Sequence, residues 1–223
     1  FCYQKSFHSF ARVLNMSMEL KDRIKTKAEE LFDLYSVRSV TMDEIATQLG
    51  ISKKTIYTCY ADKEELVDAV FCTRMEQNQE RCVFDQKVAE NAVHEIFLAW
   101  EAVSEMLSTM NPSILFDLEK YHPAVYKKYT DYKYQFLYKM ICSNIERGIK
   151  EELYRADINI EVLTRLRLST MMLSFNPNVF PMNKYKPVAV EEQILFHFLY
   201  GLSTAKGLKM IEKYKQQKAK IKS

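Results

Sequence analysis

The chain has very little glycine and proline, and this shortage constrains its fold. Only 4 Gly and 5 Pro occur among 223 residues, so tight turns and chain breaks must be few. No stretch shows the sustained alternation of polar and apolar residues that is typical of a half-buried strand. Because 48% of the residues are hydrophobic, the chain can bury a sizeable core. The sequence therefore predicts an all-α fold built from long helices.

Paired cysteines, membrane-length apolar runs and common catalytic motifs are also missing. None of the five cysteines forms a Cys-x-x-Cys pair or sits near a histidine with ligand spacing, which predicts reduced thiols, a cytoplasmic location and no metal site. No apolar run reaches the length of a bilayer span, so a membrane partner is not expected. Neither a Gly-rich phosphate loop, a His-Glu-x-x-His helix nor a Gly-x-Ser-x-Gly elbow occurs. We therefore expect neither an enzyme nor a bound cofactor.

Three histidines leave a metal site as a minor alternative. His94, His122 and His197 fall on three different predicted elements and could meet in space. Lone histidines on helices are far more often core or surface groups than ligands. The prediction therefore remains that no metal is bound.

Residues 41–63 have the pattern of two short helices joined by a tight turn. Thr41 and Glu44 form a Thr-x-x-Glu capping box that starts a helix. Gly50 can take the left-handed conformation that ends this helix, because glycine alone does so cheaply. Ser52 is a good N-cap for a second helix. This arrangement is typical of a DNA-binding helix-turn-helix.

The second of these helices carries a surface suited to DNA. No carboxylate occurs between Ile45 and Ala61, so the positive end of the helix dipole and the nearby cations stay available to phosphate. The net charge of +3 is nearly balanced, and the argument rests on this local distribution. The predicted DNA-binding residues are Thr41, Ser52, Lys53, Lys54, Thr55, Tyr57, Tyr60 and Lys63, of which Lys53, Lys54, Thr55 and Tyr57 are expected in the major groove.

These motifs resemble the N-terminal signature of the TetR/AcrR family of one-component regulators. The matching elements are Ala28 to Phe32, Ile45-Ala46, Gly50-Ile51-Ser52, Tyr57 to Tyr60 and Lys63 to Leu66. Agreement at several fixed spacings is more specific than one short motif. Two positions depart from the family pattern. Ser36 replaces the usual glycine after the first helix, which predicts a strained left-handed serine, and Cys59 replaces an aromatic residue.

The resemblance implies a homodimeric transcriptional regulator that binds a double-stranded DNA operator. We predict a sequence-specific repressor that a small apolar or aromatic ligand releases. The alternative is an all-helical ligand-binding or interaction protein without specific DNA activity. Residues 1–15 show no signal-peptide pattern and are expected to be a non-native or flexible leader. Residues 16–64 are predicted to form the three-helix DNA-binding domain, and residues 65–223 a helical bundle for ligand binding and dimerisation.

Proline and capping residues divide the predicted bundle. Helices are expected over residues 85–111, 112–122 and 123–148, and from a cap at Asp157 or Asn159 to about residue 172. Large aromatic and methionine side chains in these helices suit an apolar pocket, although plain core packing explains them equally well. The predicted ligand-binding residues are Trp100, Tyr121, Tyr126, Tyr134 and Met171.

A later helix is apolar nearly all round and must be covered on more than one side. We predict a two-fold interface between subunits that uses residues around Leu163 to Ser174 and Glu191 to Leu202. Burial within a single core is the alternative. The apolar residues are Ile194, Leu195, Phe196, Phe198, Leu199 and Tyr200.

Overall fold

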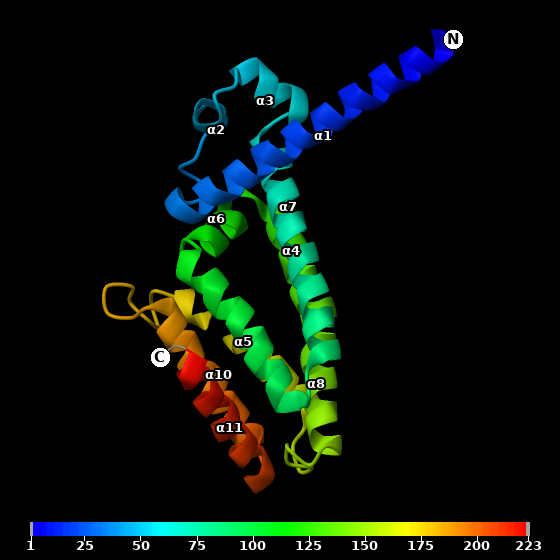
Figure 1. The fold of residues 1–223 in the computed structure, drawn as a ribbon. Coiled ribbons are helices and arrows are strands. Elements are labelled where there is room, and N and C mark those ends of the chain that lie inside the picture. Colours follow the sequence, from blue (N-terminus) through cyan, green and yellow to red (C-terminus); the bar gives the residue numbers. More distant parts are fainter. Residues whose placement is uncertain (1, 222–223) are drawn as a thin grey trace. The chain divides into compact units, whose positions relative to one another are not determined.

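The structure is a computed structural model that describes the backbone of residues 2–221 and the side chains of residues 18–219. Over this range the chain is helical, without a strand, and one isolated bridge joins Tyr154 and Ser203 (Figure 1). The predicted all-α fold is confirmed. The elements are α1 (Cys2–Tyr35), α2 (Met42–Leu49), α3 (Lys53–Cys59), α4 (Lys63–Val88), α5 (Ala92–Thr109), α6 (Ile114–Tyr121), α7 (Pro123–Tyr132), the π-helical segment η1 (Lys133–Leu137), α8 (Tyr138–Lys150), α9 (Ile160–Thr170), the 3₁₀ segment η2 (Leu173–Phe175), α10 (Pro187–Leu202) and α11 (Ala205–Ile221).

The chain divides into two compact units. The first comprises Phe1–Arg74 and Ser113–Lys128, and the second comprises Met75–Pro112 and Tyr129–Ser223. This division differs from the predicted single boundary after residue 64. The predicted leader falls on the start of α1, where the helical backbone begins at Cys2, and the side chains there lie outside the described residues.

The first unit is built on helices α1, α2 and α3, which contact one another (Figure 1). Each helix buries one apolar stripe with the spacing of three or four residues that a helix requires. These stripes fix α2 and α3 on α1 and leave their other faces exposed. The fully or almost fully buried residues are Ile24, Ala28, Leu31 and Phe32 of α1, Met42, Ile45 and Ala46 of α2, and Ile56 of α3.

Residues 113–128 join this unit through apolar and charged contacts, which is why the boundary differs from the prediction. Ile114 and Leu118 of α6 are buried at successive turns of the helix. Farther along, the ammonium of Lys128 forms an ion pair with Asp68 of α4 at 2.6 Å. Sequence periodicity indicates that a helix buries one face, but it does not identify the partner against which that face packs. The packing of residues 113–128 on the first unit was therefore not predicted.

In the second unit, one predicted helix boundary is corrected. Helix α4 continues to Val88 and α5 starts at Ala92, so the helix expected over residues 85–111 is in fact divided. Asn91 causes the division, since its side-chain oxygen accepts the backbone N–H of His94 at 2.9 Å and caps α5. The predicted cap at Asn159 is confirmed, with the N–H of Val162 at 3.0 Å from its side-chain oxygen.

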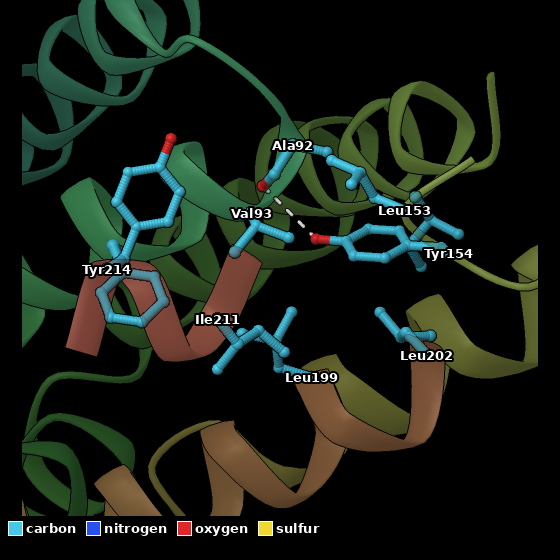
Figure 2. Packing of buried hydrophobic residues seen from close by; sticks show 10 residues of the cluster. Ala92, Val93, Leu153, Tyr154, Leu199, Leu202, Ile211 and Tyr214 are labelled. Carbon is cyan, nitrogen blue, oxygen red and sulfur yellow. Dashed lines mark hydrogen bonds between the residues drawn. The ribbon is translucent and has the colours of Figure 1, made fainter. Parts of the chain in front are cut away.

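The core of the second unit gathers residues from α5, α8, α10 and α11 and from the loop after α8 (Figure 2). Tyr154 lies inside it, and its hydroxyl donates a hydrogen bond to the carbonyl of Ala92 at 3.3 Å. A Cβ atom at position 148 would overlap the Tyr154 ring, so the close approach of this ring requires Gly148. The apolar face of α10 that carries Leu199 and Leu202 is buried here. That face is therefore covered within its own unit.

The described part of the chain contains no helix whose length and apolar character would let it cross a membrane.

Candidate nucleic-acid interface

Helix α2 begins and ends at the predicted positions. The Thr41 hydroxyl accepts the backbone N–H of Glu44 at 3.1 Å, as the capping box requires. Gly50 has a φ of 65°, which is the left-handed conformation, and the N–H of Ile51 bonds to the carbonyl of Ala46 at 3.0 Å. This bond satisfies a carbonyl at the helix end. The turn into α3 is therefore fixed by local hydrogen bonds.

Helix α3 is held by one buried side chain and one cap. Ile56 is fully buried, and the Ser52 hydroxyl accepts the backbone N–H of Thr55 at 3.1 Å. Lys54 is exposed on the opposite face, and Tyr57 has 42% of its surface exposed. Their polar groups can therefore reach a ligand outside the unit without any rearrangement of the helix.

Lys53 is also exposed, but it has a partner. Its ammonium lies 2.9 Å from the carboxylate of Asp43, and both side chains remain more than half exposed. The hydrogen bond to Asp43 raises the pKa of Lys53. Exposed ion pairs of this kind contribute little to stability. A phosphate group can therefore replace Asp43 at small cost.

Tyr60 differs from the other predicted contact residues, because it is buried. Only 3% of its surface is exposed, and its hydroxyl donates a hydrogen bond to the carbonyl of Lys21 at 3.1 Å. Burial raises the pKa of Tyr60 to about 12. The structure therefore gives this side chain a role in joining α3 to α1, and does not place its hydroxyl on the exposed surface.

Lys63 is half-buried at the start of α4. Its ammonium donates to the carbonyl of Arg38 at 3.3 Å, and burial lowers the pKa of Lys63 while Asp117 opposes this shift. The turn that contains Arg38 begins with Ser36, whose φ of 81° is left-handed as predicted. Lys63 thus lies at the edge of the exposed surface with an internal acceptor already bound.

Two residues that meet at this turn, Arg38 and Asp117, were not predicted from the sequence. The carboxylate of Asp117 accepts the backbone N–H of Arg38 at 3.0 Å, and the Arg38 guanidinium lies 5.1 Å from the centre of the Tyr121 ring. Asp117 is 4% exposed. The signal that could have identified it is its place within the apolar stripe of Ile114 and Leu118, where a carboxylate needs a buried donor.

The predicted ligand-binding residues are divided between the two units. Tyr121 and Tyr126 belong to the first unit, whereas Trp100, Tyr134 and Met171 belong to the second. A groove of about 520 Å³ in the second unit is lined by Trp100 but by none of the other four. The aromatic content of the sequence indicated that such residues were available, but not which of them converge.

The three histidines have separate roles. His94 accepts the backbone N–H of Glu90 at its Nδ1 atom and stacks on Tyr214, while His122 pairs with Glu64 in the first unit. His197 lines the groove of the second unit. Among residues with described side chains, no cluster of histidine, cysteine or acidic groups is arranged to hold a metal ion.

The fold and the exposed α3 surface define a helix-turn-helix protein with a second, all-helical unit. Residues 24–70 match the family model described as bacterial regulatory proteins, tetR family. Over this region the chain resembles the TetR/AcrR family of transcriptional regulators.

A curated regulator is also similar to part of the chain. Over 87 residues the chain is 32% identical to YvaF of Bacillus subtilis, an HTH-type transcriptional regulator, and this match covers 38% of the chain and 45% of YvaF. The chain thus spans less than half the length of this curated relative.

Two solved structures share the fold. A transcriptional regulator from Saccharomonospora viridis in complex with choline is 17% identical over 84% of this chain and 99% of its own, with a TM-score of 0.67. The ketosteroid regulator KstR2 of Mycobacterium tuberculosis is 19% identical over 82% and 95% of the two chains, with a TM-score of 0.60.

Proposed function

We propose that this protein binds a specific double-stranded DNA operator as a two-fold homodimer and represses transcription until a small ligand releases it. A two-fold dimer would present two copies of α3 to successive half-sites about 34 Å apart. The ligand would favour a dimer whose α3 spacing no longer fits. A coupling of about 1–3 kcal/mol between the two sites is sufficient for such control.

The observation that carries the DNA-binding proposal is the exposed face of α3, a helix that contains no acidic residue. Lys54 and Tyr57 project from a helix that Ser52 caps and Ile56 anchors, so their positions are fixed before DNA arrives. Lys54 can donate to phosphate or to a base edge, and Tyr57 can donate through its hydroxyl. Thr41 and Lys63 are proposed as phosphate contacts at the edge of this surface.

The competing proposal is a helical ligand-binding or interaction protein without specific DNA activity. Such a protein has no physical reason to keep carboxylates out of residues 45–61, whereas a DNA-binding surface does. The family match over residues 24–70 also favours DNA binding. Repression and release by a ligand are separate parts of this proposal, and each needs a test of its own.

A DNA-binding measurement tests the proposal. Fluorescence anisotropy would compare the DNA upstream of the protein's own gene with a scrambled fragment of equal length and composition. We expect binding to the upstream fragment at least about a thousandfold tighter than to the scrambled one. Tyr57→Ala should reduce this preference, whereas Lys209→Ala, at an exposed position of α11, should leave it unchanged. Equal affinity for both fragments would favour the competing proposal.

The sign of regulation needs a separate assay. A reporter gene placed behind the bound fragment should be silent when the protein is present and active when the protein is deleted. Activation by the protein would contradict the repressor role and leave specific DNA binding intact.

A further inference from the structure

A groove of about 520 Å³ lies among α5, α10 and α11, all within the second unit. Its size falls in the range that suits small-molecule ligands. Four Phe, Trp or Tyr rings line it, namely Phe97 and Trp100 of α5 and Phe196 and Tyr200 of α10. Trp100 is 4% exposed and belongs to the core beneath. Aromatic rings therefore form much of the lining of the groove.

Two lysines of α11 also line the groove. The ammonium of Lys215 lies 4.3 Å from the centre of the Phe196 ring and 4.9 Å from that of Tyr200. It also donates to the Tyr200 hydroxyl at 2.6 Å, and that hydroxyl donates to Glu212 at 3.0 Å. Lys215 is therefore held in one place by ring contacts and hydrogen bonds.

Lys218 carries the more informative ammonium. Its Nζ atom is buried and makes no hydrogen bond among the described residues. The nearest carboxylate oxygen, from Glu101, lies 3.5 Å away, which is a loose ion pair. A buried ammonium with unused donors is costly unless an acceptor is supplied. A ligand with an anionic oxygen would supply that acceptor in a charge-assisted hydrogen bond.

The charge of a suitable ligand follows from which charged groups of the groove already have ring contacts, hydrogen bonds or water as partners. Aromatic grooves often bind cations through their ring faces, but here Lys215 already occupies the faces of Phe196 and Tyr200. A cationic ligand would meet this ammonium and that of Lys218. Glu192 also lines the groove, but its side chain is partly exposed, so water can satisfy its carboxylate. The unused buried group is therefore a donor, and it calls for an anion.

We propose that this groove binds a small carboxylate with an apolar body, whose carboxylate group bonds to Lys218 and whose body lies on Phe97, Trp100 and Phe196. The site deepens the proposed function, because this carboxylate would be the ligand that releases DNA. The chemistry includes medium-chain aliphatic acids and arylalkanoic acids, which share both features. Their discrimination would depend on the shape of the apolar surface.

Decanoate serves as the probe, with decanol and the decyltrimethylammonium cation as partners of equal chain length. Trp100 is the only tryptophan in the chain, so its fluorescence reports on the groove directly. We expect decanoate to change this fluorescence saturably and to bind about tenfold or more tightly than decanol, since the charged hydrogen bond is absent from the alcohol. Equal affinities for the three probes, or tighter binding of the cation, would overturn the proposal.

Variants locate the carboxylate. Lys218→Gln should weaken decanoate about tenfold or more and leave decanol unchanged, because it removes the charge and keeps most of the apolar stem. Lys209→Gln, at an exposed position of the same helix, is the matched control and should bind as the original chain does. If Lys218→Gln does not fold, Lys218→Arg should fold and retain the preference for decanoate over decanol. No loss in Lys218→Gln, or loss of the preference in Lys218→Arg, would contradict the assignment.

Operator binding separates this inference from the proposed function. Without probe, binding to the upstream DNA fragment tests the proposed function alone. With decanoate, that affinity should fall at least about fivefold, and operator DNA should weaken decanoate binding by the same factor. If the protein binds the operator but gives no saturable decanoate signal, only the groove assignment is contradicted. Decanoate binding that depends on Lys218 but leaves operator affinity unchanged supports the site and overturns its role as the effector site.

Discussion

The carboxylate of Asp117 accepts a hydrogen bond from the backbone N–H of Arg38 at 3.0 Å, across 79 positions of sequence. Arg38 lies in the turn between α1 and α2, and Asp117 lies on α6. The same carboxylate opposes the burial-driven fall in the pKa of Lys63. One acidic group of α6 thus stabilises the turn that precedes the helix-turn-helix. Residues 113–128 therefore contribute directly to the conformation of that motif.

Asp117→Ala is expected to destabilise the first unit by about 1.5–3 kcal/mol, because it leaves a backbone N–H without its charged acceptor. Asp117→Asn is the matched variant, since its amide oxygen can still accept the bond, and it should lose much less. Urea unfolding followed by circular dichroism measures both. Equal losses in the two variants would show that the bond to Arg38 does not carry the effect.

A second prediction distinguishes two lysines of the proposed DNA surface. Lys54→Gln should reduce the slope of log affinity against log salt by about one unit, because a phosphate contact releases counterions. Lys63→Gln should change this slope less and lower the free energy of unfolding, since its ammonium already bonds to the Arg38 carbonyl. DNA titrations at several salt concentrations decide the point. A larger slope change in Lys63→Gln would instead make Lys63 the main phosphate contact.

The sequence predicted what local hydrogen bonds determine. The cap at Thr41, the left-handed Gly50 and the cap at Ser52 depend on residues within about one helical turn, so their residue types suffice. The left-handed Ser36 was predicted from the family resemblance, because glycine is usual at this position. The docking of α6, in contrast, depends on contacts distant in sequence. Tyr60 was predicted as a DNA contact for a similar reason. An exposed and a buried tyrosine at the end of a short helix have the same local sequence pattern.

The amino-acid composition did not indicate which residues line the groove. Trp100 was identified as a lining residue, whereas Lys215 and Lys218 were not, because α11 reads as a solvated, lysine-rich helix. The break between α10 and α11 was also not foreseen. Thr204 makes it possible, since its hydroxyl accepts the N–H of Gly207 at 3.1 Å and starts α11. The position of α11 in the folded unit then places both lysines at the groove, with the ammonium of Lys215 over the rings of Phe196 and Tyr200.

A third prediction concerns the proposed dimer. Phe198 is packed against the core of the second unit, so a charged residue there would disturb folding as well as association. Leu166 of α9 lies in the predicted interface and is 49% exposed. Leu166→Glu should therefore shift sedimentation from dimer to monomer at micromolar concentration, because an unpaired carboxylate in an interface costs several kcal/mol. Val88→Glu, at a position 48% exposed at the end of α4, is the control. A dimeric Leu166→Glu variant would place the interface elsewhere.

A fourth prediction concerns the thiol of Cys82. Burial, followed by the charge of Asp85, raises the pKa of Cys82 to about 11. The thiolate, which is the reactive form, is therefore rarer at pH 8 in the folded chain than in the unfolded chain. Iodoacetamide should label Cys82 at least about tenfold more slowly in the native protein than in urea, as measured by mass spectrometry of its peptide. Stability should fall as pH rises from 9 towards 11, because the unfolded thiol loses its proton first. Replacement by serine should remove that part of the pH dependence.

The last prediction concerns a buried ion pair in the second unit. Arg167 of α9 lies 2.9 Å from Glu191 of α10, with side chains 10% and 3% exposed. One guanidinium nitrogen and one carboxylate oxygen of the pair are buried without another partner in the described chain. Removing one charge leaves the other uncompensated in the core, so Arg167→Met or Glu191→Leu should each cost about 3–5 kcal/mol.

The double variant of Arg167→Met with Glu191→Leu should recover most of this loss, because neither residue then leaves a buried charge. A double-mutant cycle in urea measures the coupling between the two positions. If the two single losses simply add in the double variant, the pair is not electrostatically coupled, and the cost of each change must come from packing alone.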